Sequence, residues 1–245
     1  MNVTKYSANG NDFVIFHTFA KKDRRALAKA ICDRQNGVGA DGLIVLVPHD
    51  THDFEWEFYN SDGSVAEMCG NGSRACAHYA FSNGLAGANM AFLTLAGVIR
   101  AHVEGSFVKS ELTPPKILDK EINEGGKGWW KIDTGVPHLI TFDADIENFD
   151  IAEARELRHK YNANVNIAAI TKDGLVVRTY ERGVEDETLA CGTGMASAFY
   201  RAVTEGLIEK ETKVFPKSGD TLYLGIQEGV ITFGGDVKAV FKTDY

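Results

Sequence analysis

The sequence has few of the features that mark membrane, secreted or nucleic-acid-binding proteins. No apolar run is long enough for a signal peptide or a membrane span, and Met1 is followed by Asn2-Val3-Thr4-Lys5. The 26 basic residues are outnumbered by 34 acidic ones, and the net charge of −8 removes the attraction on which nonspecific nucleic-acid binding depends. We therefore expect a cytoplasmic protein with a small-molecule partner, without nucleic acid and without a membrane.

The sequence also lacks the motifs of common cofactors. It has only four cysteines, and they form no pair of Cys-x-x-Cys motifs at zinc-site spacing. The seven histidines are scattered, and neither a nucleotide-binding glycine fingerprint nor a lysine motif for pyridoxal phosphate is visible. These absences predict a protein without metal or cofactor. Its cysteines are then expected to be buried packing residues or reactive thiols, not disulfides.

The 245 residues, 44% of them hydrophobic, are enough for a sizeable core and suggest two compact lobes. Short β-type runs dominate, at residues 13–16, 43–47, 54–59, 175–180 and 221–226. One amphipathic helix is expected at about 23–36, before Gly37, and another at 151–161, burying Ala154, Leu157 and Tyr161. Proline- and glycine-rich stretches at 113–115 and 121–128 are the candidate linker.

An internal repeat surrounds two of the cysteines. Cys69 and Cys191 each begin a Cys-Gly-x-Gly segment that continues in small apolar and aromatic residues. A glycine follows each cysteine after 15 residues, at Gly84 and Gly206, and a β-type run ending in tyrosine precedes each segment. The pattern predicts two buried helices of about 11 to 13 residues, each with its cysteine just before the first turn.

Thiols at two helix starts are suited to acid–base chemistry at a carbon atom. The unpaired amides of a first helical turn lower the pKa of a thiol and attract an anion, and the glycines let the backbone approach one carboxylate. One thiolate would remove the hydrogen from an α-carbon, and the opposite thiol would return one on the other face. Cys32 and Cys76 lack this context and are predicted to be packing residues.

The two segments resemble those of the diaminopimelate epimerase family. The resemblance rests on Asn-Ser-Asp-Gly-Ser-x-Ala-Glu-Met-Cys-Gly-Asn-Gly-Ser-Arg at 60–74 and on Glu-Arg-Gly-x-x-Asp-Glu-Thr-Leu-Ala-Cys-Gly-Thr-Gly at 181–194. Further landmarks stand in the family's order at 10–13, 39–42, 137–138 and 164–166.

The resemblance implies an α+β fold of two similar lobes. Each lobe would be a rolled, mainly antiparallel sheet around a central buried helix, with the active site in the cleft between the lobes. Residues 1–116 would form the first lobe around Cys69, completed by a C-terminal strand at about 236–245. Residues 117–235 would form the second lobe around Cys191.

The resemblance also implies the reaction and its residues. LL- and meso-2,6-diaminopimelate would be interconverted without metal or cofactor, as part of lysine and peptidoglycan precursor biosynthesis, and a homodimer is possible. Cys69 and Cys191 would be acid and base, with His138 and Glu181 tuning the two thiols. The backbone amides at the reacting carboxylate would be those of Gly70, Asn71, Gly192 and Thr193. The residues at the rest of the substrate would be Asn11, Asn60, Asn164, Glu181 and Arg182, with Arg182 gripping the distal carboxylate at two points.

The sequence departs from the family pattern at a few positions. Val136 stands where many members have Asn, Gly42 where some have Gln, and Ala8-Asn9 replaces the more usual Gly-Leu, so one or two substrate contacts are expected to differ.

Other readings of the sequence remain. The chain can be read as a proline racemase or hydroxyproline epimerase, although Asn71 stands where that group has His and the Glu181-Arg182 pair has no counterpart on proline. It can also be a non-catalytic amino-acid-binding or thiol redox protein of the same fold. Individually, His138 can be a surface residue at a strand end, and Glu181 and Arg182 an exposed charged pair.

Overall fold

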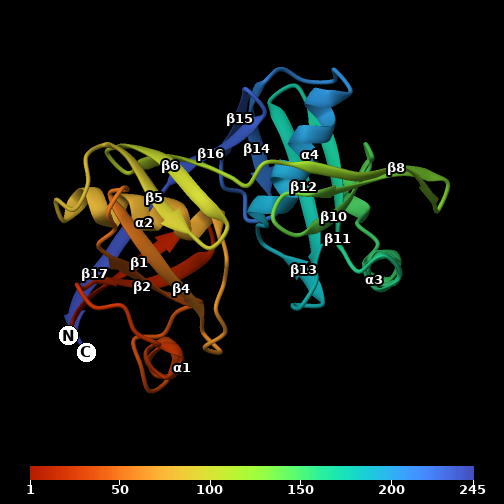
Figure 1. Ribbon diagram of the computed structural model, residues 1–245. Coiled ribbons are helices and arrows are strands. Elements are labelled where there is room, and N and C mark those ends of the chain that lie inside the picture. Colours follow the sequence, from red (N-terminus) through yellow and green to blue (C-terminus); the bar gives the residue numbers. More distant parts are fainter. The chain divides into compact units, whose positions relative to one another are not determined.

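The computed structural model describes residues 1–245 and contains four α-helices, one 3-10 helix and 17 strands (Figure 1). The chain forms two compact units: unit 1 comprises Met1–Glu111 with Gly234–Tyr245, and unit 2 comprises Leu112–Phe233. The helices are α1 (Arg25–Cys32) and α2 (Gly70–Ser82) in unit 1, and η1 (Ile146–Asn148), α3 (Ile151–Tyr161) and α4 (Gly192–Thr204) in unit 2.

Unit 1 is a mixed sheet curled around helix α2. Its strands are β1 (Asn2–Ala8), β2 (Asn11–His17), β3 (Gly42–Val47), β4 (Phe54–Asn60), β5 (Asn89–Thr94), β6 (Gly97–Glu104), β7 (Phe107–Glu111) and β17 (Lys238–Asp244). Neighbouring strands pair antiparallel except β2 with β3 and β4 with β5, which are parallel. Helix α2 packs against β1, β2, β3, β6 and β7, so the sheet surrounds it on several sides.

Unit 2 repeats this arrangement around helix α4. Its strands are β8 (Lys116–Glu124), β9 (Lys127–Asp133), β10 (Pro137–Phe142), β11 (Asn164–Thr171), β12 (Gly174–Glu181), β13 (Asp186–Thr188), β14 (Glu211–Pro216) and β15 (Leu222–Gln227), while β16 (Val230–Asp236) leads on into unit 1. Only β10 with β11 and β12 with β14 are parallel among the pairs whose register is defined. Helix α4 packs against β9 to β12 and β15.

The internal repeat is confirmed by the order of elements. Unit 1 runs β2-α1-β3-β4-α2-β5, and unit 2 runs β10-α3-β11-β12-α4-β14 with the short β13 inserted. In both, the four strands pair parallel, antiparallel and parallel in turn. The predicted α+β class with a helix at the centre of each mainly antiparallel sheet is therefore confirmed.

The two repeated helices begin and end where the sequence predicts. Cys69 and Cys191 are the N-caps, with extended backbone, and each helix has 13 residues. Gly84 and Gly206 follow the C-caps with φ of +68° and +70°, a conformation that costs glycine least. The 15-residue spacing from cysteine to glycine thus measures one helix with its caps.

Three predictions about other elements are wrong in detail. Helix α1 ends at Cys32 instead of about residue 36, because Asp33 accepts hydrogen bonds from the amides of Gln35 and Asn36 and turns the chain. The stretch 121–128 is not a linker but the turn of the β8–β9 hairpin, at Gly125 and Gly126 with positive φ. Tyr161 is half-buried, whereas Ala154 and Leu157 are buried as expected.

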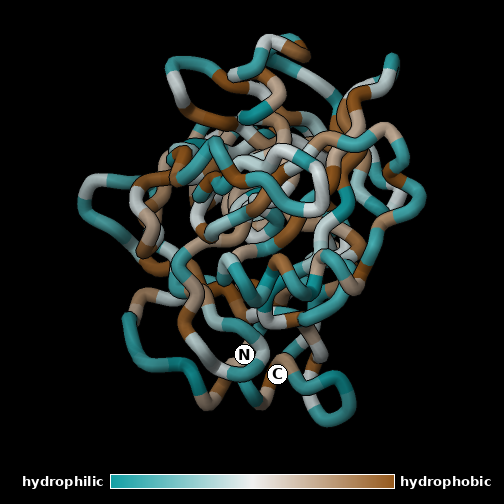
Figure 2. The backbone as a smooth tube through the Cα atoms, turned by 90° about the vertical axis from the view of Figure 1, so that its right-hand side faces the viewer, coloured by the Kyte–Doolittle hydropathy of each residue, from teal (hydrophilic) through white to brown (hydrophobic).

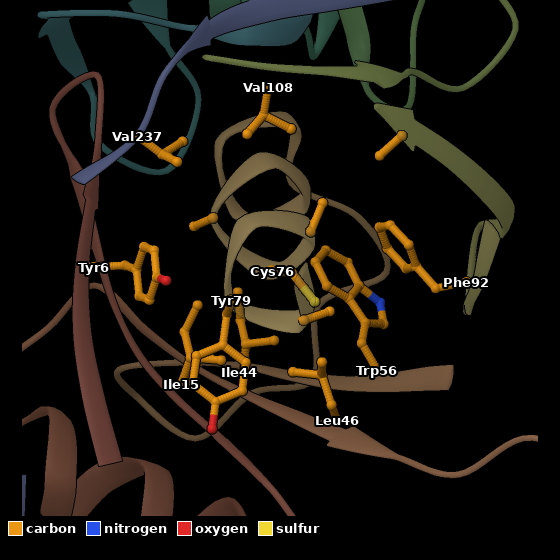
Figure 3. Close-up of a cluster of buried hydrophobic side chains, with 14 of the residues drawn as sticks. Tyr6, Ile15, Ile44, Leu46, Trp56, Cys76, Tyr79, Phe92, Val108 and Val237 are labelled. Atoms are coloured by element: carbon orange, nitrogen blue, oxygen red, sulfur yellow. The ribbon is translucent and has the colours of Figure 1, made fainter. Parts of the chain in front are cut away.

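The two remaining cysteines, Cys32 and Cys76, lie in the core of unit 1. Cys76 lies on α2 among Tyr79, Trp56 and Phe92, with no exposed surface (Figure 3). Cys32 is buried in a second apolar cluster under α1. Burial raises the pKa of Cys32 to about 12 and that of Cys76 well above its usual range. Both thiols are therefore neutral packing groups, as predicted.

The two chain ends lie side by side in unit 1 (Figures 1 and 2). Strand β17 pairs antiparallel with β1, and the Met1 ammonium donates to the Tyr245 carbonyl at 2.6 Å. No helix combines the length and the apolar character that crossing a membrane requires.

Candidate active site

Cys69 lies at the start of α2 in unit 1, where it caps the helix. Its Sγ accepts a hydrogen bond from the Gly72 amide at 3.4 Å, and its carbonyl accepts one from Ser73 at 2.8 Å. By helix geometry, the first-turn amides of Gly70 and Asn71 have no partner within the helix. The sulfur therefore stands beside a group of amide donors that suits an anion.

A network of amide side chains adjoins this helix start. Asn71 Nδ2 donates to Asn11 Oδ1 at 2.7 Å, and Asn11 Nδ2 donates to Asp41 at 3.1 Å. On the other side, the fully buried Arg74 donates to Asn71 Oδ1 at 2.5 Å and to Asn9 Oδ1 at 2.7 Å. The unusual Asn9 thus has a definite role, since it accepts a hydrogen bond from a buried guanidinium.

Charged residues hold the strand that carries Asn11. Arg34 pairs with both oxygens of Asp12 at 2.9 Å, and Lys5 lies 2.7 Å from the same carboxylate. Burial alone would raise the pKa of Asp12, but the hydrogen bonds from Arg34 and Lys5 outweigh it and lower the pKa to about 2. The carboxylate is therefore ionised at neutral pH and fixes the β1–β2 turn against its neighbours.

Asn60 is less firmly held than Asn11. It ends β4, is exposed, and donates from Nδ2 to Ser64 Oγ at 2.9 Å. Gly42 stands opposite in the β3–β4 ladder, and a Cβ there would lie 2.6 Å from the Phe58 ring. A larger residue, such as the Gln of some family members, therefore needs a different position of Phe58.

Cys191 begins α4 in unit 2 and is more buried than Cys69, at 8% exposed. Its Sγ lies 3.5 Å from Oγ1 of Thr193. Thr134 anchors the same helix start from the end of β9, since its hydroxyl donates to the Thr193 carbonyl and meets the Ser197 hydroxyl, each at 2.9 Å. The thiol is thus presented on a rigid turn with a hydroxyl beside it.

His138 is fully buried, so the reading as a surface residue at a strand end is wrong. Its Nε2 lies 2.9 Å from Thr193 Oγ1, and its Nδ1 lies 3.0 Å from Asn166 Nδ2. Burial, together with the nearby Arg182 charge, lowers its pKa to about 3. The imidazole is therefore neutral at physiological pH.

Asn164 connects His138 to Arg182. The parallel register of β10 and β11 places it opposite His138, with its Nδ2 3.4 Å from Nε2 of the ring. Its Oδ1 accepts from the Arg182 amide at 2.7 Å. The Arg182 guanidinium itself donates from Nη1 to the Asn162 carbonyl at 3.2 Å, which orients the side chain.

Glu181 ends β12, and burial raises the pKa of its carboxyl. Glu181 and Arg182 are both half-buried. The interpretation of these two residues as an exposed charged pair is therefore wrong.

The second glycine of each Cys-Gly-x-Gly segment has a packing role that was not predicted. A Cβ on Gly72 would lie 3.3 Å from both Cys69 and Ile44, and a Cβ on Gly194 would lie 2.3 Å from Oδ1 of Asn166. The second glycine of each Cys-Gly-x-Gly segment therefore makes room for the protein's own side chains. No cluster of three or more His, Cys, Asp or Glu side chains could hold a metal ion.

The comparisons with known proteins bear on the same residues. The family model described as diaminopimelate epimerase matches residues 3–118 and 131–229, which include both cysteine segments. The chain belongs to the diaminopimelate epimerase family. The resemblance found in the sequence is thereby confirmed, and with it the class of isomerase.

Relatives named diaminopimelate epimerase match over nearly their whole length. One from Nitratiruptor sp. is 62% identical over 99% of this chain and 98% of its own. Another from Campylobacter lari is 50% identical over 100% and 99%, and one from Helicobacter pylori is 42% identical over 96% and 93%.

Solved structures share the fold at low sequence identity. A phenazine biosynthesis protein of the PhzF family from Enterococcus faecalis superposes with a TM-score of 0.76 at 15% identity, covering 98% of this chain and 97% of its own. A probable proline racemase from Agrobacterium radiobacter gives 0.75 at 13%, covering 100% and 92%. At such identities the likeness concerns the fold alone.

Several polar residues around the site in this member of the family were not predicted as functional. Asn166 and Thr179 lie on β11 and β12 beside His138, and the Thr193 hydroxyl was overlooked because only its amide was expected to act. A signal was present: Asn164 and Asn166 alternate within an otherwise apolar strand, and buried polar side chains require partners.

Proposed function

We propose that this protein is a cofactor-independent epimerase that interconverts LL- and meso-2,6-diaminopimelate through the thiols of Cys69 and Cys191. The observation that carries the proposal is the position of the two cysteines, each the N-cap of a 13-residue helix at the same place in a repeated unit. The relatives' names, at up to 62% identity, indicate the substrate. The product belongs to lysine and peptidoglycan precursor biosynthesis.

The reaction requires one base and one acid. A thiolate takes the hydrogen of the substrate α-carbon as a proton, and the electron pair stays on that carbon, stabilised by the adjacent carboxylate. The other thiol then gives its proton to the opposite face, so the configuration inverts and the two thiols exchange protonation states. The first-turn amides of Gly70, Asn71, Gly192 and Thr193 are the donors proposed for that carboxylate.

The rest of the substrate is assigned to polar groups around each helix. In unit 1 these are Asn11, held by Asp41 and Asn71, and Asn60. In unit 2 they are Asn164, Glu181 and Arg182, with the guanidinium gripping the distal carboxylate and the acid and amides meeting the distal ammonium. A proline-type substrate has no second charged end for these groups.

His138 and Glu181 are proposed to assist the thiols in different ways. Since His138 is neutral, it acts on the site as a hydrogen-bond donor or acceptor and not as a cation. The carboxyl of Glu181, whose pKa is raised by burial, can hold a proton closer to neutral pH than an exposed glutamate can. We further propose a cytoplasmic location and a homodimer.

Deuterium exchange tests the reaction directly. In heavy water, the wild type should introduce deuterium at the α-carbon of meso- and LL-diaminopimelate but not of proline.

Cys69→Ser and Cys191→Ser should each lower kcat by several orders of magnitude with an unchanged fold, because a hydroxyl is far less acidic than a thiol. Cys76→Ala is the control, since that thiol is buried in the core. Turnover near the wild-type rate in either Ser variant, or a preference for proline, would contradict the proposal.

A further inference from the structure

The buried amide of Asn166 has one orientation that satisfies all its neighbours. Its Nδ2 donates to the Leu139 carbonyl at 3.0 Å, and its Oδ1 accepts from the Thr179 hydroxyl at 2.8 Å. Rotating the amide by half a turn would bring its oxygen against the Leu139 carbonyl oxygen. Because Asn166 has no exposed surface, no water could relieve that contact.

This orientation decides which nitrogen of His138 carries the hydrogen. The second hydrogen of Asn166 Nδ2 points to His138 Nδ1, 3.0 Å away. Nδ1 must therefore present its lone pair, and in a neutral imidazole the hydrogen then lies on Nε2.

The hydrogen on Nε2 reaches the helix start through Thr193. The Thr193 hydroxyl oxygen lies 2.9 Å from Nε2 and accepts its hydrogen. Asn164 also presents its Nδ2, which can only donate, to Nε2, because the Arg182 backbone amide holds its oxygen on the other side. That contact is 3.4 Å long, whereas Asn166 Nδ2 lies 3.0 Å from Nδ1, so the shorter bond from Asn166 decides the tautomer. The Thr193 hydroxyl can then donate its own hydrogen to Cys191 Sγ, which lies 3.5 Å from the hydroxyl oxygen.

Helix α4 is shaped around the same network. A Cβ at Gly194 would lie 2.3 Å from Oδ1 of Asn166 and 3.0 Å from the Thr179 hydroxyl. The absence of a side chain on Gly194 therefore lets the helix start that carries Cys191 pack directly on the amide that orients His138.

We propose that Asn166 is a positioning residue that fixes His138 with its hydrogen on Nε2, so that His138 donates to Thr193 and Thr193 donates to the sulfur of Cys191. A chain of donors ending on the sulfur favours the thiolate over the thiol. The charged or titratable groups around these hydrogen bonds are Glu181, the last residue of β12, Arg182 directly after it, and Cys191 itself. The effect on catalysis rests on the proposed function, whereas the position of the hydrogen on His138 does not.

The tautomer can be measured by ¹⁵N NMR on protein that contains ¹⁵N-labelled histidine. The signals of His138 are those that disappear in the His138→Gln variant. The wild type should show a protonated Nε2 and an unprotonated Nδ1. Asn166→Asp keeps the shape of the side chain but offers only acceptor oxygens to Nδ1. In this variant Nδ1 should therefore be protonated and Nε2 unprotonated. Thr179→Val is the matched control, because it loosens Asn166 from the other side while the Leu139 carbonyl still orients the amide.

The reactivity of the Cys191 thiol provides the second measurement. In a Cys69→Ser background, the pH profile of Cys191 alkylation by iodoacetamide should move upward by about one unit in Asn166→Asp and in Thr193→Val, which corresponds to about tenfold less thiolate at a given pH. Thr193→Ser should retain the wild-type profile.

Two results would overturn the proposal. One is a wild-type spectrum with the hydrogen on Nδ1, which decides the matter even if Asn166→Asp does not fold. The other is an alkylation profile that Thr193→Val leaves in place. Both measurements are independent of turnover, so they can fail while deuterium exchange succeeds, and the reverse.

Discussion

His138 is a histidine whose surroundings prevent it from becoming charged, and this should be visible in the stability of the protein. Its pKa of about 3 in the folded state lies below the ordinary 6.5, mainly because the ring is buried. Between these two values the unfolded chain binds a proton that the folded protein does not. The contribution of the neutral ring is therefore complete above pH 6.5 and is lost as the pH falls.

We expect the free energy of unfolding to decrease by up to about 1.4 kcal/mol for each pH unit below 6 on account of His138. Urea unfolding of wild type and His138→Gln at pH 6.5, 6.0, 5.5 and 5.0 measures the slope, and other titrating groups cancel in the difference. Parallel slopes in the two proteins would show that His138 is not held neutral.

Substitution of Arg182 tests how the enzyme selects a substrate with a second carboxylate. Lys in its place keeps the charge but loses the planar two-point contact with a carboxylate. Arg182→Lys should therefore lose roughly 1.5 to 3 kcal/mol of transition-state binding, or about 10- to 150-fold in kcat/KM for diaminopimelate. The melting temperature should barely change, because the guanidinium makes only the Nη1 bond to Asn162. Unchanged kcat/KM would remove Arg182 from the substrate site.

At the scale of elements, the glycines that end α2 and α4 are required by backbone conformation alone. Gly84 and Gly206 have φ near +70°, and a Cβ on either would meet nothing within 4 Å. Gly84→Ala and Gly206→Ala should therefore each destabilise the protein by about 1 kcal/mol without changing kcat, because an L-residue is strained there.

The control for these variants is Gly128→Ala. Residue 128 has the same open space but no positive φ. There the substitution should be neutral or stabilising in thermal or urea unfolding, since it restricts only the unfolded chain. Equal losses at all three positions would contradict the role assigned to the positive φ.

The elements show how far sequence reasoning reaches. Helices α2 and α4 could be predicted together with their caps, because a cysteine, the glycines and a fixed spacing are local signals. The stretch 121–128 was read as a linker because glycines mark hairpin turns and linkers alike. Whether such a stretch joins two strands depends on the pairing of residues on either side, which composition does not reveal.

The site was predictable in its reactive residues but not in their supports. Cys69 and Cys191 are recognisable from a repeated motif. Asn9, Asn166 and Thr179 act through partners distant in sequence. The packing of α2 on β1 and β2 brings Arg74 to Asn9, and the register of β10, β11 and β12 brings His138 and Thr179 to Asn166. Burial, which decides the charge of His138, is likewise a property of the packed sheet.

At the scale of the whole molecule, activity should depend on reduced thiols and not on a bound metal. Dialysis against EDTA should leave turnover unchanged. Treatment with peroxide should abolish turnover until a reductant is added, because an oxidised sulfur cannot accept or return a proton. Loss of activity in EDTA, restored by zinc, would contradict a thiol-only mechanism.

The pairing of β17 with β1 affects the order in which the protein can fold during synthesis. Unit 1 begins first, but its last strand, residues 238–244, follows the whole of unit 2 in the sequence. Unit 2 has its full sequence once Phe233 has left the ribosome, so the later half is the first to be complete. Until residues 238–244 have been synthesised, the edge of β1 that receives β17 stays unpaired, so a ribosome that stalls between Phe233 and Lys238 would hold a complete unit 2 and an incomplete unit 1.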